Sequence, residues 1–259
     1  MKRRHLLAAL PCACLLARAL AADGDTGVVL LHGKQAGPRG IADLASTLRD
    51  AGCRVGVPEM PWSRRRDFDV PYPAALEEIA AAGQALQAAG AQRLVVGGHS
   101  MGANAALAYA ASGHPVSGVF ALSPGHVAEA PRFHQQVAAG VQKAREMVAA
   151  GSGEDKAWFP DTNQGRQRQV RTTALAYLSY FDPQGTGSLL RSCRALPAGV
   201  PLFMSMGESE GTLDYARATL FPAAPANARS VFLAVPGDHF SAPRAAAPRL
   251  VQWLQGLAA

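Results

Sequence analysis

The chain of 259 residues has little cysteine, and its one long apolar run lies at the N-terminus. Four cysteines are too few for a disulfide-built scaffold, and only Cys53 and Cys193 follow the N-terminal segment. Because each leads into a different predicted strand, we favour two buried free thiols over a disulfide between them. No later stretch has the ~20 apolar residues that a membrane-spanning helix needs.

The sequence also lacks the motifs of cofactor enzymes. It contains no G-x-G-x-x-G or P-loop sequence, and no cluster of His, Cys or Asp has the spacing of metal ligands. No basic stripe or aromatic-interleaved basic motif indicates nucleic acid. We therefore expect no cofactor, no metal and no nucleic-acid partner.

The first residues, MKRRHLLAALPCACLLARALAADG, have the pattern of a secretory leader. Basic residues at 2–4 precede a short apolar run, and an A-x-A cleavage site occupies 19–21. The pattern predicts a signal peptide over 1–21, a mature domain over 22–259, a periplasmic or secreted location and no stable membrane anchor. Removing the leader takes away four basic residues and no acidic one, so the formal net charge falls from +6 to +2.

Strand-like and helix-like segments alternate along the rest of the chain. The short connections between them indicate crossover units and hence a parallel sheet. The sequence predicts one α/β domain, with a mostly parallel sheet of about six strands and helices on both faces. The expected strands are 26–33, 53–60, 93–100, 116–125, 200–207 and 229–237, and the expected helices are 41–52, 74–90, 103–112 and 247–258.

One connection is far longer than a helical crossover requires. It separates the strand that ends near Ser123 from the strand that starts near Val200. We expect an insertion over 126–196 that forms a helical cap. Its first helix should run from Pro131 to about Ala150, and its second should lie around Arg171 to Tyr180.

The stretch LVVGGHSMGANAAL, residues 94–107, carries the strongest candidate for chemistry. An apolar strand passes through glycines into Ser100 and then directly into an Ala-rich helix. So tight a turn needs residues without bulk, and Gly98 and Gly102 flank the serine in a G-x-S-x-G pattern. The pattern predicts that the Ser100 hydroxyl stands above the end of a strand, at a helix N-terminus.

A second stretch, Gly207 to Gly211, fits the same pattern around Ser209. Acyl transfer develops negative charge beside the nucleophile, and Ser209 has a glutamate on each side that would oppose this charge. Ser209 also leaves little sequence after it to supply both a base and an orienting acid. We therefore take Ser100 as the nucleophile.

Taken in order, the segments VVLLHG, GGHSMG, GESE and PGDHF resemble an α/β-hydrolase, and they look most like the small exported bacterial esterase and lipase-like members. The resemblance covers essentially the whole mature chain. It implies the α/β-hydrolase fold, with the long insertion at the place where such proteins insert a cap. It also implies the chain order of serine, acid and histidine.

In that order His239 is the general base, because it follows the last strand and can reach over the sheet to Ser100. The family's aspartate lies three residues after a glycine, and Glu210 occupies this position here. Glu210 is thus the expected acid. The alternatives for this role are Glu208, Asp214 and Asp238.

An oxyanion also needs two backbone N–H donors. The resemblance assigns them to Met101, at the start of the helix after Ser100, and to Lys34, the residue after His32 and Gly33. Only the backbone of Met101 and Lys34 is implicated.

Substrate contacts are expected at the rim and in the cap. Trp62 and Arg64 follow the second strand and could bind an anionic or aromatic group, although arginines in solvent or paired with nearby aspartates are the simpler interpretation. In the insertion, Tyr177 and four other aromatic residues could line an apolar acyl pocket above Ser100 or form the cap's own core. The five residues are Trp158, Phe159, Tyr177, Tyr180 and Phe181.

Together these features predict an exported, monomeric serine hydrolase that cleaves a small carboxylic ester through an acyl-enzyme on Ser100. The same triad would serve an acyltransferase or thioesterase, since the three differ in the substrate or in the acceptor that resolves the acyl-enzyme. A non-catalytic binding protein on a hydrolase scaffold is the third hypothesis.

Overall fold

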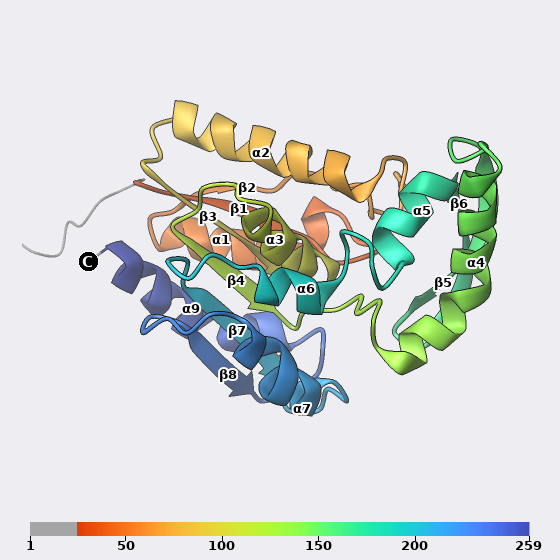
Figure 1. Cartoon of the computed structure of the whole chain (residues 1–259). Coiled ribbons are helices and arrows are strands. Elements are labelled where there is room, and N and C mark those ends of the chain that lie inside the picture. The colour runs from red at the N-terminus through yellow and green to blue at the C-terminus, as the bar shows by residue number, and fades with distance from the viewer. Residues whose placement is uncertain (1–24, 259) are drawn as a thin grey trace, which may run out of the picture.

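A parallel sheet of six strands forms the centre of the protein (Figure 1). The computed structural model describes residues 25–258, so the predicted signal peptide over 1–21 lies outside the described residues. The strand order is β2-β1-β3-β4-β7-β8. The prediction of an α/β fold with about six parallel strands is confirmed. The strands are β1 (Thr26–Leu31), β2 (Arg54–Gly56), β3 (Arg93–His99), β4 (Gly118–Leu122), β7 (Leu202–Gly207) and β8 (Val231–Val235).

Helices cover both faces of this sheet (Figure 1). On one face, α1 (Ala42–Asp50) and α9 (Ala242–Ala258) bury the strand residues that include Leu30. On the other, α2 (Tyr72–Ala88) and α3 (Met101–Ala111) bury a second set that includes Leu31. Successive strand side chains point to opposite faces, so a strand covered on both sides must be apolar, as β4 and residues 27–31 of β1 are.

Short helical segments complete the domain. They are η1 (Pro38–Ile41), α6 (Leu189–Arg194), α7 (Leu213–Tyr215), the π-helical turn η2 (Ala216–Leu220) and α8 (Phe221–Ala223).

The order of the strands places a crevice between β1 and β3. The chain leaves β1 to form β2 on one side, and it then crosses over to place β3 on the other side of β1. In open parallel sheets, ligands bind at such a switch point, outside the carboxyl ends of the strands. The residues that follow β1 and β3 are His32 to Lys34 and Ser100, so this topology brings them together.

The insertion between β4 and β7 forms a lobe at the right of Figure 1. It contains α4 (Pro131–Ala149), the antiparallel hairpin of β5 (Lys156–Asn163) and β6 (Arg166–Thr173), and α5 (Ala174–Phe181). The first predicted cap helix is present as α4. The hairpin occupies the middle of the cap, so the cap is only partly helical, and its second helix, predicted around Arg171 to Tyr180, runs from Ala174 to Phe181. The boundaries 126 and 196 stay predictions.

The hairpin turn explains how a polar sequence forms two strands here. Gln164 and Gly165 both have positive φ, 49° and 75°, the combination that a two-residue connection between twisted strands requires. In β6, RQRQVRTT, only Val170 and Thr172 are buried. Alternation over so few residues is too weak a signal to predict a strand.

Candidate active site

Ser100 lies at the turn between β3 and α3. Its backbone has φ 57° and ψ −118°, a conformation that a non-glycine residue keeps only where its surroundings impose it. The flanking glycines allow β1 to approach closely, because a Cβ at Gly98 or Gly102 would lie 2.3 or 2.2 Å from the Leu31 carbonyl oxygen. Backbone packing against β1 therefore explains the G-x-S-x-G pattern.

The second G-x-S-x-G stretch has a different role in the structure. Ser209 lies in the loop after β7, and its backbone N–H donates to the carbonyl oxygen of Gly237 at 3.0 Å. This bond joins the loop after β7 to the loop after β8. The two loops carry Glu210 and His239 respectively, so the stretch brings these side chains together.

Glu210 and His239 form a hydrogen-bonded pair. Their Oε2 and Nδ1 atoms are 2.8 Å apart, while Glu210 Oε1 accepts bonds from the Ser123 hydroxyl at 2.6 Å and the Gly207 N–H at 2.7 Å. Burial raises the pKa of the Glu210 carboxyl, but these hydrogen bonds outweigh it, so the pKa lies below its usual value. Glu210 is thus held as a carboxylate that orients the imidazole.

The other three candidate acids face elsewhere. Glu208 is exposed, and the Asp214 side chain is 96% exposed. Asp238 Oδ1 accepts hydrogen bonds from the Ser241 hydroxyl at 2.7 Å and from the Ser241 N–H at 2.9 Å, which closes a local turn. The structure therefore brings Glu210 to His239, and its catalytic role stays a prediction.

A second histidine supports the first. The His99 ring lies 4.7 Å from the His239 ring, and its Nε2–H donates to the His239 carbonyl oxygen at 2.8 Å. Burial and the neighbouring His239 lower the pKa of His99 to about 4. His99 therefore stays neutral near pH 7 and fixes the His239 backbone without adding charge.

Ser100 and His239 meet across Gly125, a residue that the sequence did not single out. A Cβ at this glycine would lie 2.9 Å from Ser100 Oγ and 3.7 Å from His239 Cε1. Within residues 25–258 Ser100 Oγ makes no direct hydrogen bond. Catalytic hydrogen bonds often tighten only when substrate binds, so this geometry is compatible with a serine and base pair.

The two expected oxyanion donors lie on either side of the crevice. Met101 is the first residue of α3, where the N–H has no partner within the helix and the helix dipole favours negative charge. Lys34 follows β1, and its loop is fixed by a bond of 2.9 Å from the Gln35 N–H to the Trp62 carbonyl oxygen. In the described part of the chain, neither the Lys34 nor the Met101 N–H has a hydrogen-bond partner.

His32 and Trp62 hold this loop in place through buried hydrogen bonds. The Met60 N–H donates to His32 Nε2 at 3.0 Å, so the ring proton is on Nδ1, which lies 2.9 Å from the Gly33 carbonyl oxygen. The indole N–H of Trp62 donates to the His32 carbonyl oxygen at 2.7 Å. Both side chains are completely buried.

A cavity of about 720 Å³ lies over Ser100 and His239. Its lining joins the sheet loops to the cap, because it includes the hairpin turn at Asn163 to Gly165. Apolar residues and hydrogen-bonding residues both contribute to the lining. The apolar residues are Pro124, Val127, Ala130, Phe133 and Phe240, and the polar ones include Lys34, His126, Gln136, Thr162, Asn163, Gln164 and Thr212.

The three residues predicted to bind substrate, Trp62, Arg64 and Tyr177, are not among the residues that line this cavity. Trp62 is buried beneath the loop after β1, and Arg64 is exposed at the surface. Tyr177 is completely buried, and its hydroxyl donates to the Pro160 carbonyl oxygen at 2.6 Å. Its ring stacks on Phe159 and Phe181, with centroids 4.4 and 4.3 Å away.

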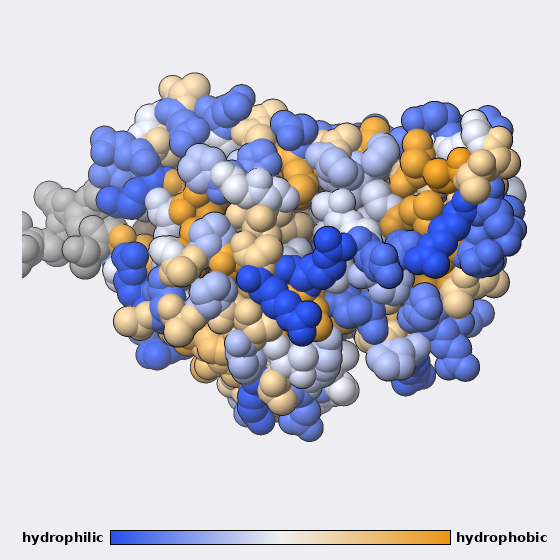
Figure 2. All heavy atoms as spheres, in the orientation of Figure 1, coloured by the Kyte–Doolittle hydropathy of each residue, from blue (hydrophilic) through white to orange (hydrophobic). Residues whose placement is uncertain are grey.

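The cap aromatics therefore form the lobe's own core. Phe159, Tyr177, Tyr180 and Phe181 are all completely buried, whereas Trp158 is 59% exposed. Val148 and Leu175 of the cap are also exposed. Figure 2 shows apolar surface over this lobe, next to strongly hydrophilic residues.

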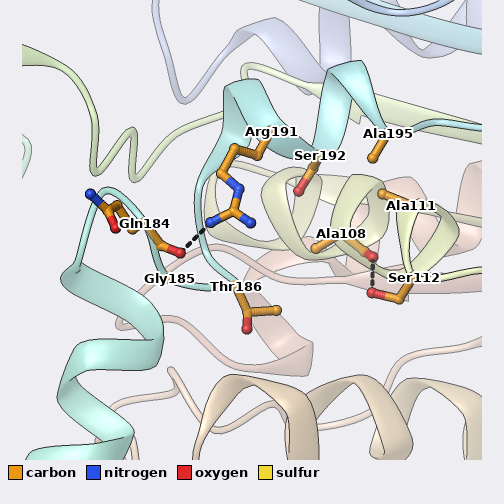
Figure 3. Close-up of a pocket in the computed structure, with 9 residues that line it drawn as sticks. All are labelled: Ala108, Ala111, Ser112, Gln184, Gly185, Thr186, Arg191, Ser192 and Ala195. Carbon is orange, nitrogen blue, oxygen red and sulfur yellow. Dashed lines mark hydrogen bonds between the residues drawn. The ribbon is translucent and has the colours of Figure 1, made fainter.

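A smaller hollow of about 280 Å³ lies between the end of α3 and α6 (Figure 3). Arg191 donates to the Gln184 carbonyl oxygen across it, and the Ser112 hydroxyl donates to the Ala108 carbonyl oxygen at 2.8 Å. It contains none of the predicted catalytic residues. Within residues 25–258 no group of three or more His, Cys, Asp or Glu is placed to hold a metal ion, and no helix is long and apolar enough to cross a bilayer.

The chain matches the model of the alpha/beta hydrolase fold family over residues 28–157, half of its length, and it belongs to this family. It is similar to a highly thermostable carboxyl esterase from Bacillus coagulans, with a TM-score of 0.64, 15% identity and 91% of each chain covered. A monoacylglycerol lipase from Paleococcus ferrophilus gives a TM-score of 0.65 and 17% identity, over 89% of this chain and 94% of that one.

A thioesterase domain from the curacin biosynthetic pathway gives a TM-score of 0.54 and 18% identity, over 90% of this chain and 91% of that one. At such identities the likeness shows the shared fold alone. No curated protein matches the sequence.

Proposed function

We propose that this chain is a serine hydrolase that cleaves carboxylic esters through an acyl-enzyme on Ser100. The observation that carries the proposal is the convergence of three parts on one cavity. Ser100 at the strained turn supplies the nucleophile, the pair of His239 and Glu210 supplies the base, and the N–H groups of Lys34 and Met101 supply charge stabilisation.

In the proposed reaction, His239 Nε2 takes the proton of Ser100 as Oγ attacks the ester carbonyl. Glu210 keeps the other ring proton on Nδ1 and stabilises the imidazolium that forms. The N–H groups of Lys34 and Met101 donate to the oxyanion. His239 then gives its proton to the leaving alkoxide, and attack of water on the acyl-enzyme repeats the sequence and frees the serine.

The lining of the cavity supports a short or polar acyl group as the substrate class. The lining includes Gln136, Asn163 and Gln164, and a long alkyl tail would have to pack against these polar side chains. Cap aromatic residues that could have added apolar lining to the cavity, such as Tyr177, are buried in the cap core.

Labelling with a fluorophosphonate probe tests the proposal. We expect Ser100→Ala to abolish labelling and to lower kcat for p-nitrophenyl acetate by a factor on the order of 10⁵ to 10⁶. Ser209→Ala, the matched control in the second G-x-S-x-G stretch, should keep both. Across p-nitrophenyl esters from acetate to palmitate, kcat/KM should be highest for the short acyl groups.

Two outcomes would contradict the proposal. Labelling that persists in folded Ser100→Ala and disappears in Ser209→Ala would reassign the nucleophile. A folded wild-type protein that neither reacts with the probe nor hydrolyses any ester or thioester would favour a binding protein on this scaffold. Faster turnover of thioesters than of matched esters would move the assignment to a thioesterase.

The proposal includes export, which rests on the leader pattern over 1–21. N-terminal sequencing of protein recovered from the periplasm or the medium should find Ala22 as the first residue. Full-length protein confined to the cytoplasm would contradict export without affecting the proposed chemistry.

A further inference from the structure

The side chain of Lys34 leaves the sheet domain and ends in the cap. Its Nζ donates to Asp161 Oδ1 at 2.7 Å and to the Thr162 carbonyl oxygen at 2.6 Å, and it lies 3.3 Å from His126 Nδ1. Three acceptors match the three N–H bonds of an ammonium group. The Lys34 and Asp161 side chains are only 4% and 0% exposed, so a buried ion pair joins the loop after β1 to strand β5.

His126 is fixed by the same contact. Its Nε2–H donates to the Tyr180 carbonyl oxygen at 2.9 Å, which leaves Nδ1 as the acceptor that faces Lys34. Burial and the charge of Lys34 hold the pKa of His126 well below its usual value. The ring therefore accepts from the ammonium group and does not repel it.

Further charges extend the contact across the hairpin. Asp161 and Arg168 lie opposite each other in the register of β5 and β6, with Asp161 Oδ2 and Arg168 Nη1 4.0 Å apart. Arg168 Nη2 donates to Asp67 Oδ1 at 2.7 Å, and Gln35 Nε2 lies 3.5 Å from the same oxygen. The side chains of two consecutive loop residues, Lys34 and Gln35, therefore both contact one network of alternating positive and negative groups.

A buried ion pair often contributes little to the net stability of a protein. Desolvation of the two charges opposes their attraction, and well-packed apolar side chains of the same size often stabilise a protein as well. A hydrogen-bonded ion pair also fixes direction, since its bonds form only in a narrow range of distance and angle. Here it fixes the side chain of the residue whose backbone N–H is one of the expected oxyanion donors.

We propose that Lys34 is a positioning residue, whose side-chain ion pair with Asp161 of the cap holds the Lys34 N–H in place for the oxyanion. The inference rests on the proposed acyl transfer at Ser100. The cap then contributes to transition-state stabilisation without touching the reacting atoms. Because an oxyanion donor must lie within hydrogen-bond distance of the developing charge, a small shift of this loop lowers the rate.

The double variant Lys34→Met/Asp161→Leu separates positioning from stability. It removes both charges and keeps apolar side chains of similar size, so no unpaired charge is left buried. We expect it to fold and to lose about 10- to 100-fold in kcat for p-nitrophenyl acetate, less than removal of a whole oxyanion donor, with little change in KM. Lys143→Met is the matched control, because Lys143 bonds the Trp158 carbonyl of the same strand from an exposed position.

A trifluoromethyl ketone gives a readout that a purely structural role would not change. The ketone adds to the serine as a tetrahedral adduct whose oxyanion needs the same N–H donors. We expect its inhibition constant to rise in the double variant by about the same factor as kcat/KM falls. The Lys143→Met control should keep both values.

An unchanged kcat and inhibition constant in the folded double variant would overturn the inference. If the double variant does not fold, Asp161→Asn decides the question, because the amide oxygen still accepts from Lys34 while the charge is lost. We expect a smaller fall in kcat and in inhibitor affinity, in parallel, and no fall would overturn the inference. Failure of the proposed function is recognised separately, since the wild-type protein would then fail to react with the fluorophosphonate.

Discussion

The sheet and the cap hold their parts of the site through different kinds of contact. In the sheet, Gly98 and Gly102 press the turn at Ser100 against the backbone of Leu31. In the cap, a polar hairpin reaches the loop after β1 through the buried pair of Asp161 and Lys34. The position of the proposed nucleophile therefore depends on backbone packing within the sheet, whereas the proposed charge stabilisation depends in part on ionic contacts with the insertion.

Among variants that keep Ser100, the largest expected effect concerns the contacts made within the sheet domain. Glu210→Gln should lower kcat by about 10³- to 10⁴-fold, because the amide no longer stabilises the His239 imidazolium and can favour the wrong ring tautomer. Steady-state kinetics with p-nitrophenyl acetate measure the loss. Glu208→Gln, in the same loop but exposed, should leave kcat nearly unchanged. Equal losses in the two variants would show that the acid has been misassigned.

The next effect concerns what fills the cap. Tyr177→Ala should lower the free energy of unfolding by about 3–5 kcal/mol, because it removes a completely buried ring stacked between Phe159 and Phe181. Trp158→Ala, the control on the exposed side of the hairpin, should change stability little. Urea unfolding and the series of acyl esters test both variants. An altered chain-length preference at unchanged stability would show that Tyr177 lines an acyl pocket after all.

The smallest effect sharpens the role of backbone packing in the sheet. Gly102→Ala places a Cβ 2.2 Å from the Leu31 carbonyl oxygen, so β1 and the turn at Ser100 must move apart. We expect a loss of about 1–3 kcal/mol in unfolding free energy together with lower activity. In Gly256→Ala, a helix position with no atom near the added Cβ, stability should instead rise by up to about 1 kcal/mol. Thermal melts of the two variants that coincide would contradict the packing argument.

The same difference between the sheet and the cap explains which parts of the structure the sequence could predict. Strands β1, β3 and β4 are buried on both faces, so their apolar runs and the turn at Ser100 are local signals that the sequence shows directly. Strand β6 buries only two residues, and nothing local indicates that it pairs with β5. The fold and the turn at Ser100 were therefore predictable, while the hairpin was not.

The hydrogen bonds that hold the site residues in place also leave no local pattern in the sequence. Ser123 bonds Glu210 from 87 positions away, and Lys34 bonds Asp161 from 127 positions away. Such contacts depend on the tertiary fold, so the sequence left four carboxylates open as the acid. Trp62 was predicted at the rim because it follows β2, but its N–H bonds the loop beneath the site instead.

The two cysteines within residues 25–258 show which kind of contact stabilises the fold. Cys53 packs against the cluster beneath α1 and α9, Cys193 lies in the cluster on the opposite face of the sheet, and both are free thiols. Burial raises the pKa of both thiols, that of Cys193 to about 12, so little reactive thiolate forms at neutral pH. The fold of residues 25–258 has no disulfide between them to form or to lose. Packing within these two clusters, and not a cross-link between them, therefore stabilises this part of the chain.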